Sequence, residues 1–100
     1  MLIYLGADHR GFALKERIKD FLHNGGYAVE DAGNVRYEDG DDYPDYAAAV
    51  AREVSKDPAG RRGILVCGSG VGVDVVANKF PGVRSALALS VDQVNAARHD

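Results

Sequence analysis

The stretch of residues 63–72, GILVCGSGVG, constrains the fold of this chain most strongly. An apolar run leads into the only cysteine, and glycine then takes every second position. This order predicts a buried strand, a glycine-rich turn and a helix with Val71, Val75 and Val76 on one side and Asp74 in solvent. Unpaired main-chain N–H groups in such a turn suit an oxyanion or a phosphate. A tight turn that binds no ligand would give the same pattern.

The rest of the chain alternates between strand and helix patterns. Short apolar runs at residues 2–5, 27–29 and 83–89 predict three further strands. Helical spacing predicts one helix closed by the glycines at 25 and 26, another near Pro44, and a last one from Ser90, where a capping box begins. The polar residues 34–42 predict a loop. On the first helix the predicted apolar face consists of Leu14, Ile18, Phe21 and Leu22, with Lys15 on the opposite face.

This alternation predicts a three-layer, Rossmann-like α/β fold with a parallel sheet and helices on both faces. Ligands in such folds bind beyond the carboxyl ends of the strands. Polar or glycine-rich residues follow three of the predicted strands at that end: Asp8 and His9, residues 67–72, and the residues from Ser90 onward. We therefore expect the functional site at this edge of the sheet.

Composition limits the class of protein. A chain of 100 residues, 46% hydrophobic and 27% charged, fits one globular domain over residues 1–100. The net charge of −3 argues against nucleic acid as a partner. The apolar runs are too short to span a membrane, and the start of the chain does not resemble a signal peptide. A single cysteine fits a reducing cytoplasm, which we expect as the location.

Cys67 and the pair Asp8 and His9 are the residues that most favour chemistry. Taken alone, Cys67 fits a small buried side chain, but a position before a helix favours its thiolate form. Asp8 could orient His9 or bind ligand hydroxyls, or it could cap a helix beside a solvated histidine. Tyr43 would pack or form a lip of the cleft, and His99 alone fits a surface position near a helix end. The spacing of His, Cys and acidic residues matches no metal site.

Three motifs resemble those of a known family. Residues 5–15 (LGADHRGFALK) are similar to its first motif, residues 42–46 (DYPDY) to its second, and residues 63–72 with 77–79 to its third. They occur in the same order and over the whole chain. The chain therefore resembles the type B ribose-5-phosphate isomerases, which are grouped with galactose-6-phosphate isomerase.

The resemblance implies a reaction and a set of residues. These enzymes interconvert an aldose phosphate and a ketose phosphate through a cis-enediolate, without a metal or cofactor, and as homodimers or tetramers. Cys67 would be the base, and His99 and the hydroxyl of Ser69 would assist opening of the sugar ring. The remaining residues would bind substrate: Asp8, His9, Tyr43, Asp100, and the turn residues Gly68, Gly70, Val71 and Gly72.

The chain departs from the family pattern at three places. Ser69 replaces a frequent threonine and keeps the hydroxyl, whereas Asp100 replaces an asparagine and donates no hydrogen bond unless it is protonated. The family continues through a further strand and helix whose arginines bind phosphate, so we expect the domain to be truncated. That role is not transferred to Arg10, Arg84 or Arg98.

The resemblance favours ribose 5-phosphate and ribulose 5-phosphate, of the pentose phosphate pathway, as the substrate pair. A six-carbon sugar phosphate such as galactose 6-phosphate or allose 6-phosphate is the alternative. A phosphate-binding module without catalysis is the alternative from another class. A dinucleotide-binding module fits less well, because Val73 stands where its fingerprint requires glycine.

Overall fold

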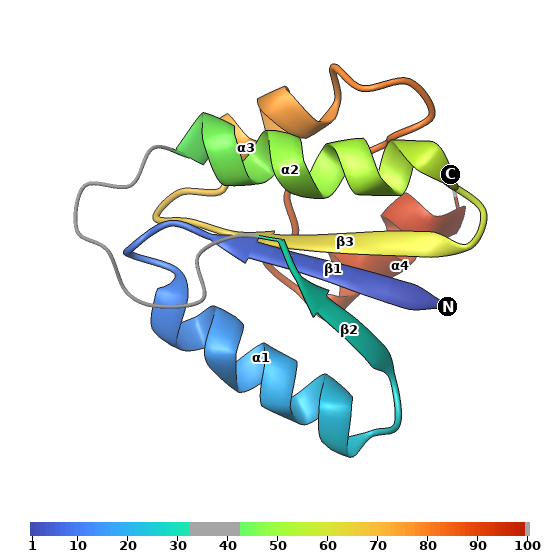
Figure 1. Ribbon diagram of the computed structural model, residues 1–100. Helices are drawn as coiled ribbons and strands as arrows, with labels where there is room; N and C mark the ends of the chain where they lie inside the picture. Colours follow the sequence, from blue (N-terminus) through green and yellow to red (C-terminus); the bar gives the residue numbers. More distant parts are fainter. Residues whose placement is uncertain (33–42, 100) are drawn as a thin grey trace.

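The computed structural model describes residues 1–32 and 43–99, without the side chains of residues 43–45 and 99. Three parallel strands form its sheet in the order β2–β1–β3 (Figure 1). They are β1 (Leu2–Ala7), β2 (Ala28–Asp31) and β3 (Arg61–Val66). The predicted loop at residues 34–42 lies outside the described residues.

Helices lie on both faces of the sheet. The helix α1 (Phe12–Asn24) covers one face, whereas α2 (Tyr43–Lys56) and α3 (Val71–Ala77) lie on the other (Figure 1). The last helix is α4 (Val91–His99). This arrangement confirms the predicted three-layer α/β fold. No helix in the described ranges is long and apolar enough to cross a membrane.

The core lies between the sheet and α2. Ala47 of α2 is fully buried there, and Tyr46 and Val73 pack beside it. Val50 of α2 is 2% exposed and faces Gly6 of β1 and Gly63 of β3. Full burial of a valine side chain stabilises a fold by about 1.5–3 kcal/mol, so this layer holds α2 against the sheet. β1 ends at the carboxyl edge of the sheet and α2 begins near that edge (Figure 1), which is where the site was expected.

The predicted faces of α1 are wrong. Lys15 is fully buried, whereas Leu14 and Phe21 are 51% and 73% exposed. The cause is an ion pair, because the Lys15 ammonium lies 2.7 Å from the Asp31 carboxylate at the end of β2. The aliphatic stem of the lysine fills the space between helix and sheet. Leu14 and Ile18 instead line an open groove of about 1330 Å³.

The predicted strand at residues 83–89 is also wrong. These residues form no strand, so the sheet has three strands within the described part of the chain. Ser85 satisfies its main-chain groups without a sheet: its N–H donates to the Asn78 side chain at 2.8 Å, and its carbonyl accepts from the same amide at 3.0 Å. Both main-chain groups of Ser85 are therefore paired without a neighbouring strand.

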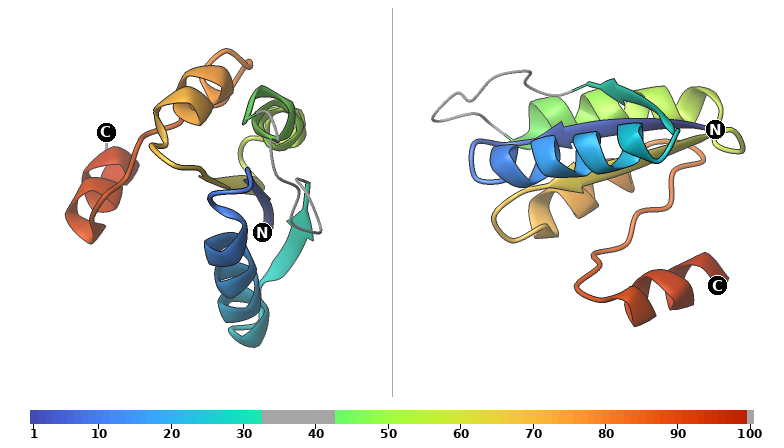
Figure 2. Two further views of the ribbon diagram at one scale, coloured as in Figure 1. Left: turned by 90° about the vertical axis from the view of Figure 1, so that its left-hand side faces the viewer. Right: turned by 90° about the horizontal axis from the view of Figure 1, so that it is seen from below.

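The C-terminal helix α4 stands apart from the other described helices and strands (Figure 2). Its predicted start is confirmed, because the Gln93 N–H donates to the Ser90 hydroxyl at 3.2 Å. The side chains of Leu89 and Val91 are 79% and 76% exposed at this start. The structure therefore leaves apolar surface uncovered between α4 and the sheet.

The predicted apolar side of α3 is wrong for Val71 and Val75, whereas Val76 packs against the core cluster as expected. Val73 and Ala77 are the buried residues of α3, whereas Val71 and Val75 are more than half exposed. Packing against α2 decides this, since Val73 joins Tyr46 in the core cluster. The start of α3 is therefore held rigidly beside the end of β3.

Candidate active site

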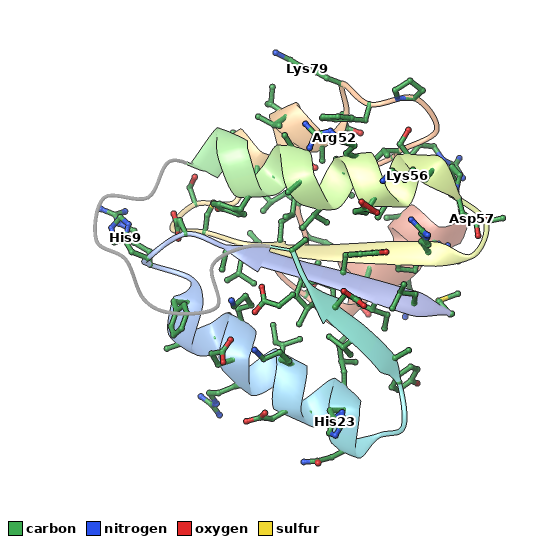
Figure 3. All side chains as sticks on the ribbon, viewed as in Figure 1. His9, His23, Arg52, Lys56, Asp57 and Lys79 are labelled. Atoms are coloured by element: carbon green, nitrogen blue, oxygen red, sulfur yellow. The ribbon has the colours of Figure 1, made fainter. Side chains whose placement is uncertain are left out.

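A cleft of about 680 Å³ lies at the carboxyl ends of β1 and β3. The turn after β1 forms one wall, and the glycine-rich turn after β3 forms the other. His9 points outward beyond the end of β1, at the left of Figure 3. The cleft is lined by Asp8, His9, Arg10, Cys67, Gly68, Ser69, Val71 and Gly72.

Cys67 is the first residue after β3 and is half-buried. One side of it packs against the core cluster that contains Tyr46 and Val73. Its sulfur accepts a hydrogen bond from the Gly70 main-chain N–H at 2.9 Å. An N–H donor stabilises negative charge on an acceptor, so this contact suits a thiolate as nucleophile or base.

The turn after Cys67 depends on Gly70. Its φ of +81° is in the left-handed region, and a Cβ there would lie 2.5 Å from the side chain of Leu87. Glycine meets both conditions because it has no Cβ. This conformation aims the Gly70 N–H back at the sulfur. The next N–H, of Val71, donates to the Ser69 hydroxyl at 3.3 Å.

Asp8 shapes the opposite wall. Its carboxylate accepts a hydrogen bond from the Gly11 N–H at 2.8 Å, and its own N–H donates to the Val66 carbonyl at 3.3 Å. A Cβ on Gly11 would lie 2.5 Å from that same carbonyl oxygen. The two walls therefore meet at the floor of the cleft through main-chain contact. Asp8 caps the turn and also lines the cleft.

Tyr46 supports the floor from below. Its side chain is 5% exposed, and its hydroxyl donates to the Val66 carbonyl at 3.3 Å. Burial raises the pKa of Tyr46 above its usual value of 10.0, and the nearby charges of Asp8 and Cys67 raise it further. The phenol therefore stays protonated at neutral pH and remains a donor.

Comparison with known proteins identifies the family. The sequence profile described as Ribose/Galactose Isomerase matches residues 3–100. The chain belongs to this family. It is similar to the ribose-5-phosphate isomerase B of Mycobacterium tuberculosis strain H37Rv, with 47% identity over 98 residues, 98% of this chain and 60% of that protein. The chain thus spans about three fifths of the length of this relative.

Two further relatives extend the comparison. A crystal structure of ribose-5-phosphate isomerase B from Mycoplasma genitalium with bound ribulose-5-phosphate matches with a TM-score of 0.93 and 41% identity, covering 97% of this chain and 64% of that one. A 4-deoxy-4-sulfo-D-erythrose isomerase from a Clostridium species is 38% identical over 90 residues, which are 90% of this chain and 56% of that protein.

Three of the residues expected in the site are not among the described residues that line the cleft. His99 is the last residue of α4, and α4 contributes none of the described residues that line the cleft. Tyr43 begins α2, and its side chain is not described. Asp100 lies outside the described residues. The roles of these three residues stay predictions.

Sequence reasoning missed Arg10 and Tyr46 in this site. The position of Arg10 directly after Asp8 and His9 could have indicated a site residue. An arginine in a turn, however, is usually solvated. Tyr46 has the spacing of a core residue, and the sequence gives no sign that its hydroxyl reaches the floor of the cleft. Within the described ranges, no three His, Cys, Asp or Glu residues gather closely enough to hold a metal ion.

Proposed function

We propose that the chain carries the catalytic cleft of an aldose–ketose isomerase that interconverts ribose 5-phosphate and ribulose 5-phosphate. The observation that carries the proposal is the hydrogen bond from the Gly70 N–H to the Cys67 sulfur, in a cleft that also contains Asp8 and His9. Family membership and the names of the relatives support the same activity.

In the proposed mechanism, the Cys67 thiolate removes the proton from C2 of the open-chain aldose. The electrons of that C–H bond form the C1–C2 double bond, and negative charge moves to the carbonyl oxygen as the cis-enediolate forms. Main-chain N–H groups of residues 68–72 stabilise this oxyanion. The thiol then returns the proton to C1, and the hydroxyl proton on O2 moves to O1, which gives the ketose with its carbonyl at C2. Oxidation at C2 balances reduction at C1, so no external oxidant or cofactor takes part.

The other residues bind the substrate in this proposal. Asp8 and His9 hold sugar oxygens or the phosphate end, and Tyr43 and Asp100 contribute further contacts. Ser69 and His99 assist ring opening before the proton transfer. We also propose a cytoplasmic homodimer in the pentose phosphate pathway, on the basis of the resemblance.

Two other substrates are candidates because relatives or family members act on them. Galactose 6-phosphate or allose 6-phosphate would need a deeper cleft. The name of the Clostridium relative makes a sulfonated four-carbon sugar a further candidate substrate, and this sugar also carries an anionic group at one end. Turnover of the purified protein with each substrate decides among them, and the highest kcat/KM identifies the preferred chain length and anion.

The test of the mechanism uses the single cysteine of the chain. Cys67→Ala should lower kcat by about a thousandfold, with substrate affinity largely kept, because a general base contributes about 10²–10⁴ to the rate. Iodoacetamide should inactivate the wild-type enzyme, and ribose 5-phosphate should protect it. A wild-type enzyme that keeps its activity after complete alkylation would refute Cys67 as the base. A protein that binds sugar phosphate without turnover would favour the non-catalytic module.

A further inference from the structure

Arg10 crosses the cleft from one wall to the other. It lies in the turn between β1 and α1, yet its side chain lies over Gly68 of the opposite turn. A Cβ on Gly68 would be 2.8 Å from both Cδ and Nη1 of Arg10. The guanidinium therefore lies beside the residue that directly follows Cys67. Among the described residues that line the cleft, Arg10 is the one lysine or arginine.

Arg10 has no acidic partner among the described residues. It forms no salt bridge in residues 1–32 and 43–99, and its side chain is exposed. Other arginines are engaged: Arg61 pairs with Glu53 at 3.3 Å, and Arg52 lies over the Phe80 ring. A guanidinium has five N–H donors in a fixed plane and binds phosphate or carboxylate through two of them at once. Arg10 is therefore available to an anion that enters the cleft.

We propose that Arg10 binds a negatively charged oxygen group of the substrate, which is either its phosphate or the enediolate oxygen. This inference rests on the proposed function, in which the substrate reacts at Cys67 beside Gly68. The chain has a net charge of −3, and Asp8 adds a carboxylate to the cleft. A fixed positive charge at this point offsets their repulsion of an anionic sugar.

The first experiment measures how the positive charge of Arg10 affects the approach of an anion to Cys67, and it needs no catalytic turnover. Cys67 is alkylated with iodoacetate, which is an anion, and with iodoacetamide, which is neutral and has similar size. Arg10→Gln should lower the ratio of the iodoacetate rate to the iodoacetamide rate by about three- to tenfold, the range expected for one partly exposed charge. The iodoacetamide rate alone detects any change in the reactivity of the Cys67 thiol. Added salt should reduce the wild-type ratio toward that of the variant.

Two variants control this measurement. Arg17→Gln removes the same charge from an exposed position of α1 that does not line the cleft, and it should leave the ratio unchanged. Arg10→Lys keeps a positive charge, so its ratio of alkylation rates should stay close to the wild-type value. A ratio that Arg10→Gln leaves at the wild-type value overturns the proposal.

The second experiment identifies which oxygen group Arg10 binds. With ribose 5-phosphate, a KM raised about tenfold at unchanged kcat, together with weaker inhibition by inorganic phosphate, assigns Arg10 to the phosphate. A lower kcat at unchanged KM assigns it to the enediolate. Kinetic constants within twofold of the wild type overturn the proposal, whatever the alkylation ratio. A wild-type protein without turnover contradicts the proposed function, while the alkylation ratio still tests anion binding by Arg10.

Discussion

The hydroxyl of Tyr46 donates a hydrogen bond to the carbonyl oxygen of Val66, at 3.3 Å. That carbonyl belongs to the peptide bond that joins Val66 to Cys67, and it also accepts the N–H of Asp8. One oxygen atom thus connects α2 with the ends of β1 and β3. The position of Cys67 relative to Asp8 depends on this junction.

Tyr46→Phe should lower the free energy of unfolding by about 1 kcal/mol at pH 7, because one buried hydrogen bond is lost. The pH dependence should change too. Since the folded protein holds the phenol proton more tightly than the unfolded chain, the wild type loses stability as the pH rises above about 10. Tyr46→Phe has no phenol at this position, so it should lose less stability than the wild type as the pH rises above about 10. Urea unfolding at pH 7 and at pH 10.5 measures both effects.

The control for this prediction is Tyr4→Phe, which removes a buried phenol outside the cleft. If Tyr46→Phe and Tyr4→Phe show the same stability at both pH values, the junction at Val66 has no energetic role.

Gly70→Ala should disturb both the fold and the cleft. The left-handed backbone costs an alanine about 1–2 kcal/mol, and its Cβ would also collide with Leu87. Relief of that collision moves the Gly70 N–H away from Cys67, so kcat should fall at least about tenfold. Thermal unfolding and steady-state kinetics measure the two effects.

Gly26→Ala is the matched control for Gly70→Ala. Gly26 has a φ of +86°, but a Cβ there would meet no atom within 4 Å. It should lose similar stability from the backbone and keep the wild-type kcat. Equal kcat values for the two variants would contradict the proposed part of Gly70 in the site.

The buried pair of Lys15 and Asp31 should respond strongly to single substitutions. Asp31→Leu should destabilise the protein by about 3 kcal/mol, because the ammonium of the fully buried Lys15 loses the carboxylate at 2.7 Å and keeps the more distant one of Glu16 at 3.4 Å. Lys15→Met combined with Asp31→Leu should recover much of that loss, since no buried charge remains. Urea unfolding of Lys15→Met, of Asp31→Leu and of the double variant gives the coupling energy. Additive losses in the double variant would show that the pair is not coupled.

Asn78→Ala should release residues 83–89 from α3. It removes the side chain that pairs both main-chain groups of Ser85, so the Ser85 amide should exchange its hydrogen at least about tenfold faster. Lys79→Ala, next to it on an exposed position, is the control and should leave the exchange rate unchanged. Unaltered exchange in Asn78→Ala would mean that other contacts hold this segment.

Local sequence patterns predicted much of the fold. The strand, turn and helix around Cys67 were predicted correctly because an apolar run, alternating glycines and a helical period each have a direct structural cause. The glycines after α1 and the capping box at Ser90 were correct for the same reason. These features depend on neighbours in sequence.

The errors arose where distant residues decide the outcome. Lys15 is buried because Asp31, sixteen residues later, supplies its counter-charge. Residues 83–89 have the composition of a strand, but Asn78 satisfies the main-chain groups of Ser85. Periodicity alone contains no information about such partners.

The candidate site was predicted only in part from the sequence. The order of the motifs led to Asp8, His9 and the turn after Cys67, which the structure brings into one cleft. The reach of Arg10 across that cleft depends on how closely two turns approach, and no local pattern encodes this distance.

Gly11 sets a limit on how such a cleft could be redesigned. A Cβ at that position would overlap the carbonyl oxygen of Val66, so any other residue would force the two turns apart. The base of the cavity therefore has a fixed width that engineering cannot enlarge without separating β1 from β3. Attempts to fit a bulkier sugar should alter the rim, at Arg10 or Ser69, where side chains reach solvent.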